Sequence, residues 1–74
     1  MPTAIGYLEL AARPKIGDTV TLPAGLKYVN EFYATNHVAS SEREVKIVEI
    51  CRDEIFWKIG DGESCYARYR RKAA

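Results

Sequence analysis

Residues 45–69 constrain the fold more than any other part of the chain, because they predict three β-strands joined by two tight turns. Asp61-Gly62 is typical of a two-residue type I′ turn, in which both central residues have positive φ. With a turn there, Trp57 lies opposite Tyr66 on the neighbouring strand. A second turn at Asp53-Glu54 then places Ile50 opposite Trp57 on its other side.

The same register pairs Val48 with Ile59 and Glu49 with Lys58. The second of these pairs joins opposite charges across two strands, which favours the pairing. One face of the three strands is then apolar and consists of Val48, Ile50, Ile55, Trp57, Ile59 and Tyr66. This segment predicts a small all-β architecture and does not indicate an activity.

The part of the chain before this meander contains one clear strand and two ambiguous segments. Within Ile16–Leu22, hydroxyl and apolar side chains alternate from Thr19 to Leu22, which predicts a half-buried strand that follows a turn or bulge at Gly17-Asp18. Ile5–Leu10 fits a strand or a short helix, and we favour the strand. Residues 24–37 fit either a helix of about three turns or an irregular loop with a short strand at Leu26–Val29, which aromatic β-propensity favours slightly.

Five strands of this size leave exposed sheet edges unless the sheet closes into a small barrel. Gly17, Asp18, Val20 and Leu22 match the glycine–acidic–x–Val–x–Leu strand that often opens a Src-homology-3-like barrel, which this layout resembles. The stretch 24–28, Ala-Gly-Leu-Lys-Tyr, resembles the Ala-Gly-x-x-Tyr stretch of the bacterial cell-wall-binding branch. The resemblance covers about residues 15–69 and implies a five-stranded barrel that ends in a three-stranded meander.

The length of 74 residues predicts one domain over residues 1–74, with its core at 15–69 and a basic tail at 70–74. A domain of this size buries about 60% of the surface of its unfolded chain, so a deep active site beside the core is not expected. Residues 1–66 carry seven basic and ten acidic side chains, whereas residues 67–74 carry four basic and no acidic ones. The body is therefore mildly acidic and the C-terminal segment basic.

The two cysteines are expected to be free thiols. In the predicted meander Cys51 faces Phe56 and Cys65 faces Lys58, with the central strand between the two cysteines. Two strand spacings amount to about 9–10 Å, which exceeds the Cα separation of about 7 Å that a disulfide tolerates. Free thiols suit a reducing compartment. Since no apolar run is long enough to span a membrane and no signal-peptide pattern is present, we expect a cytoplasmic protein.

No residue pattern indicates catalysis, a cofactor or a metal site. His37 is the single histidine, and the predicted loop around it does not place it beside a cysteine. The acidic pairs at 53–54 and 61–63 lie at predicted turns, where carboxylates are normally solvated. No CxxC motif or histidine cluster accompanies the cysteines. We therefore expect a protein that is not an enzyme.

Aromatic residues in and near the long excursion predict a binding surface instead. A groove beside the sheet would be lined by Tyr28, Phe32, Tyr33, Asn36 and Trp57. Aromatic grooves bind peptides, sugar–peptide fragments or unstacked bases. The alternative is that some of these rings fill the core, and Trp57 in particular has apolar neighbours. The sequence predicts a non-catalytic module that recognises a protein, a peptide or a cell-wall fragment.

Two further functions fit the sequence. Aromatic and basic residues interleave near the C-terminus, as in proteins that bind single-stranded nucleic acid by stacking and by neutralising phosphates. The residues concerned are Tyr66, Arg68, Tyr69, Arg70, Arg71 and Lys72. A small nucleic-acid-binding regulator is thus the first alternative. The second is an accessory or inhibitor protein of a phage or mobile element in bacteria.

Overall fold

The computed structural model describes residues 4–60 and 62–72, and every regular element within them is a β-strand. Eight strands follow one another: β1 (Leu8–Leu10), β2 (Thr19–Leu22), β3 (Lys27–Asn30), β4 (Thr35–Val38), β5 (Arg43–Lys46), β6 (Glu49–Cys51), β7 (Glu54–Ile59) and β8 (Glu63–Arg71). The all-β prediction is confirmed, whereas the predicted number of five strands is wrong. In these ranges no helix has the length and hydropathy needed to cross a membrane.

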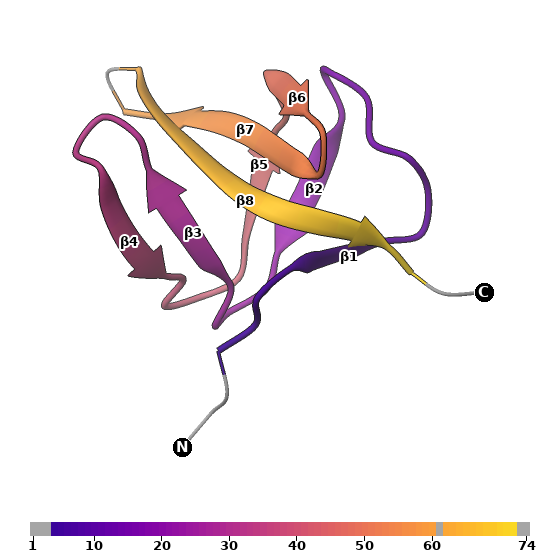
Figure 1. Ribbon diagram of the computed structural model, residues 1–74, viewed down its shortest axis with the longest axis horizontal. Coiled ribbons are helices and arrows are strands. Elements are labelled where there is room, and N and C mark those ends of the chain that lie inside the picture. The colour runs from indigo at the N-terminus through magenta and orange to yellow at the C-terminus, as the bar shows by residue number, and fades with distance from the viewer. Residues whose placement is uncertain (1–3, 61, 73–74) are drawn as a thin grey trace.

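The strands form two sheets (Figure 1). Strands β4, β3, β8, β7 and β6 make an antiparallel sheet in this order, and β1 joins it by pairing in parallel with the end of β8. Strands β2 and β5 form a separate antiparallel pair, which lies behind β7 and β8 in the view of Figure 1. Among the described strands no ladder joins the two sheets, and no closed barrel forms.

The core lies between these two sheets. Its buried apolar residues are Leu8, Leu22, Leu26, Ile47, Ile55, Trp57, Cys65 and Ala67. Leu8 precedes the expected core of residues 15–69. Strand β8 continues to Arg71, so Arg70 and Arg71 of the expected basic tail belong to the sheet. The ordered fold therefore extends beyond the predicted core at both ends, while positions 73–74 lie outside the described residues.

The predicted register of the β7–β8 hairpin is wrong by one residue. Trp57 lies opposite Cys65, and Phe56 lies opposite Tyr66. The predicted turn includes Asp61, which lies outside the described residues, but Ile59 pairs with Glu63, so three residues separate the strands. A shift of one residue moves every side chain of β8 to the opposite face. Tyr66 therefore points away from the core, and the small side chains Cys65 and Ala67 point into it.

The register of the β6–β7 hairpin differs from the prediction by two residues. Ile50 pairs with Ile55 and Glu49 with Phe56, so the predicted Glu49–Lys58 and Ile50–Trp57 pairs do not form. The turn is made by Arg52 and Asp53, and Arg52 has a positive φ of 55°. Two hydrogen bonds to β8 hold this turn: the Tyr69 N–H donates to the Asp53 carbonyl oxygen at 2.7 Å, and the Tyr69 hydroxyl donates to the Arg52 carbonyl oxygen at 3.1 Å.

The strand predicted over residues 45–51 is interrupted, because the chain passes there from one sheet to the other. The Ile47 N–H donates to the Asp18 carbonyl oxygen beside β2, whereas the Val48 N–H donates to the Phe56 carbonyl oxygen on β7. Ile47 is 1% exposed, but Val48, which the sequence placed on the apolar face, is 40% exposed. The predicted Val48–Ile59 pair is therefore wrong as well.

The N-terminal half contains more β-structure than the sequence indicated. The predicted strand in Ile5–Leu10 is confirmed as the shorter β1, and the strand in Ile16–Leu22 as β2. Residues 24–37 form neither a helix nor an irregular loop: β3 and β4 make an antiparallel hairpin in which Tyr28 lies opposite His37. The predicted short strand at Leu26–Val29 overlaps β3.

Candidate functional site

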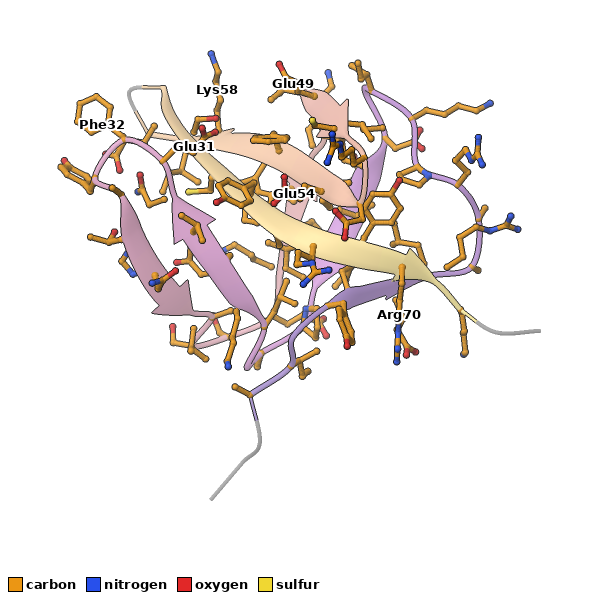
Figure 2. The ribbon with its side chains drawn as sticks, viewed as in Figure 1. Glu31, Phe32, Glu49, Glu54, Lys58 and Arg70 are labelled. Atoms are coloured by element: carbon orange, nitrogen blue, oxygen red, sulfur yellow. The ribbon has the colours of Figure 1, made fainter. Side chains whose placement is uncertain are left out.

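The residues predicted to form one aromatic groove lie in three different places. Phe32 and Tyr33 lie in the β3–β4 turn, 70% and 60% exposed, with their rings edge to face at 4.9 Å. Figure 2 shows Phe32 at the tip of this hairpin, pointing away from the rest of the molecule. Tyr28 and Trp57 face the core. Asn36 is exposed on β4, and of the five residues only Tyr28 and Asn36 border the large groove described below.

Trp57 is a core residue, as the alternative interpretation of the sequence stated. It is 2% exposed, and its ring centroid lies 5.9 Å from that of Tyr28, which in turn stacks on His37 at 5.3 Å. Tyr28 and Trp57 border a hollow of only about 70 Å³. This volume is far below the range of about 300–1,000 Å³ typical of ligand sites. These rings therefore fill the interior of the fold.

The basic and aromatic residues of β8 divide between the two faces of the sheet. Side chains alternate along a strand, so Tyr66, Arg68 and Arg70 share the outer face with Phe56, whose ring lies 5.2 Å from that of Tyr66. Tyr69 packs against the core instead. Arg71 shares the parity of Tyr69, and Lys72 follows the end of β8. The six residues of the predicted nucleic-acid surface therefore do not form one surface.

A groove lies on the outer face of the larger sheet. Its volume is about 620 Å³, and its lining comes from the loop before β1 and from strands β3, β4, β7 and β8. The lining residues are Gly6, Lys27, Tyr28, Val29, Asn36, His37, Val38, Glu54, Tyr66, Ala67 and Arg68. The groove is thus assembled from segments that are distant in the sequence.

The groove exists because β3 and β8 separate after a short ladder, as the two diverging ribbons of Figure 1 show. This ladder pairs Val29 with Tyr66 and Asn30 with Cys65. Beyond it, the Lys27 N–H donates to the Ile5 carbonyl oxygen at 2.9 Å. The continuing part of β8 pairs with β1 instead. Residues 6–7 cross from one strand to the other and close one end of the opening.

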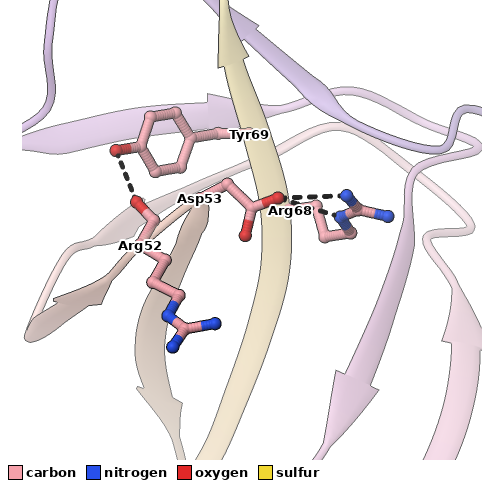
Figure 3. Close-up of polar contacts among 4 residues, drawn as sticks. All are labelled: Arg52, Asp53, Arg68 and Tyr69. Atoms are coloured by element: carbon pink, nitrogen blue, oxygen red, sulfur yellow. Dashed lines mark hydrogen bonds and ion pairs between the residues drawn. The ribbon is translucent and has the colours of Figure 1, made fainter.

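The charged groups of the groove come from both sides. Lys27 on β3 and Arg68 on β8 are exposed cations, and Glu54 lies opposite Arg68 on β7. Arg68 is held by Asp53: its Nε and Nη2 donate to the Asp53 Oδ2 at 3.2 and 3.0 Å (Figure 3). Val29 and Tyr66, which pair across the same two strands, also line the groove.

A second arginine extends this arrangement along β8. Figure 2 shows Arg70 reaching from the end of β8 toward β1, where its Nη2 donates to the Glu9 Oε1 at 2.8 Å. The guanidinium carbons of Arg70 and Arg68 lie 4.5 and 5.9 Å from the ring centroid of Tyr7. Since both ion pairs are exposed, each contributes at most about 1 kcal/mol to stability, and their main effect is to orient the guanidinium groups.

The histidine and the two thiols lie apart from one another in the sheet order. His37 is on β4 and Cys51 on β6, which are the outermost strands of the sheet, and the His37 Nε2 lies 2.7 Å from the Thr35 Oγ1. Cys65 is buried on β8, and burial, assisted by Glu63, raises the pKa of its thiol. A buried thiol with a raised pKa is a poor nucleophile. Within the described ranges no group of three metal-ligand side chains occurs.

Comparisons with models of protein families, with curated proteins and with solved structures found no match. The site must therefore be interpreted from its own geometry. Sequence reasoning missed Lys27, Val29, Val38 and Glu54 as groove residues. The alternation of Lys27 and Val29 was a usable signal, because it places both on one face of a strand, but the pairing of β3 with β8 could not be inferred locally.

Proposed function

We propose that this protein is a non-catalytic binding module whose ligand is an extended peptide or a segment of another protein held in the outer groove. The observation that carries the proposal is the groove of about 620 Å³ on a single sheet face. This volume falls in the range of about 300–1,000 Å³ typical of ligand sites. The groove also combines apolar lining with a few polar and charged groups, as such sites generally do.

The shape of the groove favours an extended chain over a compact small molecule. Its walls include the backbone of two separating strands, and backbone groups beside a sheet can bond to the main chain of an extended peptide. Val29, Val38 and Tyr66 offer apolar contacts, and Asn36 offers an amide. The binding surface differs from the one predicted around Phe32 and Tyr33, which lie at the hairpin tip.

A capture experiment with two matched aromatic substitutions tests this function. Tyr66→Ala removes the ring that lines the groove, and Phe32→Ala removes an exposed ring outside it. We expect immobilised Tyr66→Ala protein to lose its partner from a native lysate treated with nuclease, and Phe32→Ala protein to retain it, with both proteins folded by circular dichroism. The reverse result would assign binding to the hairpin tip.

Nucleic-acid binding is a second candidate, which one observation favours: Tyr66, Arg68 and Arg70 share an outer face with Phe56. Exposed aromatics on a sheet can stack bases while cations neutralise phosphates. Residues 1–66, however, carry ten acidic against seven basic side chains, and this net negative charge disfavours a polyanion. If this function holds, affinity for a single-stranded oligonucleotide will fall steeply with salt, and Arg70→Gln will weaken it.

A Src-homology-3-like arrangement remains our interpretation at the level of fold family. It is supported by the order of strand, long excursion and three-stranded meander, with the excursion occupied by the β3–β4 hairpin. A sugar–peptide fragment of the cell-wall type should therefore be titrated into the protein as well as peptides. The two free thiols on opposite faces of the sheet are compatible with a reducing compartment such as the cytoplasm.

A further inference from the structure

The position at which β3 and β8 separate coincides with a pair of like charges. If the register of Val29 with Tyr66 continued along both strands, Lys27 would lie directly opposite Arg68. Like charges directly opposite each other on a sheet face destabilise strand pairing. The ladder ends before this pair, and both cations line the resulting groove from opposite sides. The sheet therefore opens where two positive charges would otherwise meet.

The two cations line the groove from the two separating strands and can both donate hydrogen bonds to a ligand. Arg68 is oriented by the Asp53 Oδ2, a contact that uses two of its N–H donors and leaves the others of the five-donor guanidinium for a further acceptor. Lys27 is exposed on the facing strand. A carboxylate that accepts hydrogen bonds from both would form charge-assisted bonds, which are stronger than neutral ones. It would also relieve the repulsion across the opening.

We propose that the groove recognises an acidic peptide, in which a carboxylate side chain binds between Lys27 and Arg68 and an apolar side chain two residues away, on the same face of the extended peptide, packs on Val29 and Tyr66. This inference rests on the function proposed above and specifies the chemistry of its ligand. Glu54 also lines the groove, and residues 1–66 carry ten acidic against seven basic side chains. These negative charges disfavour a polyanion and favour a ligand with few carboxylates, so a peptide fits better than a nucleic acid.

The test uses three short capped peptides in which leucine lies two residues from aspartate, asparagine or lysine, with serine between them, so that both side chains share one face of an extended chain. Each is titrated into the isotopically labelled full chain while amide chemical shifts are followed. We expect the aspartate peptide to shift amides of residues 6, 27–29 and 66–68. The asparagine peptide should bind about tenfold more weakly or worse, because it loses the charge-assisted hydrogen bonds. The lysine peptide should not bind.

Charge reversals identify the residues responsible. Lys27→Glu and Arg68→Glu should each weaken the aspartate peptide at least tenfold, and the double reversal should bind the lysine peptide in preference. Lys58→Glu is the matched control, because Lys58 is an exposed cation on the same face that does not line the groove, and it should leave the affinity unchanged. A thermal melt of each variant confirms that it is folded.

The other outcomes separate this inference from the function on which it rests. Equal binding of all three peptides in the groove would overturn the charge preference and leave a peptide-binding module. If no peptide shifts the amides of the groove, the inference is overturned. The capture experiment with Tyr66→Ala and Phe32→Ala protein then tests separately whether the groove binds a protein partner. Groove shifts produced by a single-stranded oligonucleotide instead of the aspartate peptide would overturn the inference in favour of nucleic acid.

Discussion

At the scale of single residues, Trp57 and Tyr66 illustrate how one step of register decides what a side chain contacts. The sequence indicated both as neighbours on one face, but Trp57 faces Cys65 in the core and Tyr66 faces outward. The alternation of apolar residues on β7 correctly predicted burial of Ile55 and Trp57. It could not determine the loop length, because glycines at 60 and 62 both accept positive φ, at 53° and 96°, and so permit more than one turn.

Truncating the tryptophan tests its assignment to the core. Trp57→Ala should lower the free energy of unfolding by about 3–5 kcal/mol, as for other large-to-small core substitutions. Phe32→Ala removes a ring that is 70% exposed and should change stability by about 0.5 kcal/mol or less. Urea denaturation monitored by circular dichroism measures both values. Equal effects of the two substitutions would contradict the assignment.

The two cysteines should differ in reactivity and in their effect on pH stability. Cys51 is exposed and should react with iodoacetamide rapidly, whereas buried Cys65 should react only through unfolding. The folded state raises the pKa of Cys65, so the unfolded chain releases this proton first, and stability should decline above about pH 8.5, the ordinary thiol pKa. Cys65→Ala should lack this decline in a series of urea melts between neutral and alkaline pH. If the stability of Cys65→Ala protein declined at alkaline pH as much as that of the unchanged protein, Cys65 would not be the cause of the decline.

At the scale of elements, the β3–β4 hairpin shows why residues 24–37 were ambiguous in the sequence. Its apolar residues fit a helical spacing as well as a strand, so periodicity did not decide between them. Asn30, which is 5% exposed, makes side-chain hydrogen bonds at the turn of this hairpin. Its Oδ1 accepts the N–H of Phe32 at 3.0 Å and of Tyr33 at 3.4 Å, and its Nδ2 donates to the Glu63 Oε1 at 2.9 Å. The last bond is to β8, so it is not visible in local sequence.

Removing this amide should loosen the hairpin. Asn30→Ala leaves two turn N–H groups and a half-buried carboxylate without their partner, and should cost about 1–3 kcal/mol of stability. Asn36→Ala is the matched control, because Asn36 is exposed on β4 and none of the hydrogen bonds among the described side chains involves it. Urea melts measure the cost, and hydrogen exchange of the β3 and β4 amides locates it. A uniform loss of protection across both sheets would instead indicate a global effect.

At the scale of the whole molecule, the passage of the chain at residues 47–48 joins the two sheets. The predicted single strand required one alternation over Val45–Cys51. The adjacent apolar residues Ile47 and Val48 interrupt that alternation. Before them the core-facing residues have odd numbers, Val45 and Ile47, whereas after them the core-facing residue Ile50 has an even number. This change of parity was the sequence signal for a change of sheet.

A matched pair of substitutions at this passage tests the two-sheet arrangement. Ile47→Ala should lower the free energy of unfolding by about 2–5 kcal/mol, because it empties a site between the sheets. Val48→Ala should change it by about 0.5 kcal/mol, as at other surface positions, since Val48 is 40% exposed. Thermal and urea unfolding give both values. If the strand were continuous with Val48 in the core, Val48→Ala would destabilise the protein more than Ile47→Ala.

The groove was the least predictable part of the molecule for the same long-range reason. Its residues come from the loop before β1, from the β3–β4 hairpin and from β7 and β8. Local patterns predicted the meander β6–β7–β8 and the strand β2, which are formed by neighbours in the chain. They contained no information about β3 or β1 pairing with β8, and the binding surface depends on where these two pairings begin and end.

Strand β8 also determines when the protein can fold during synthesis. It pairs with β7 along one edge and with β3 and β1 along the other. Chains emerge from the ribosome N-terminus first, so β1 and the β3–β4 hairpin leave the exit tunnel before the strand that holds them in the sheet. The Glu9–Arg70 contact alone spans 61 residues, and such distant contacts slow folding. The larger sheet can therefore be completed only after β8 has emerged from the ribosome.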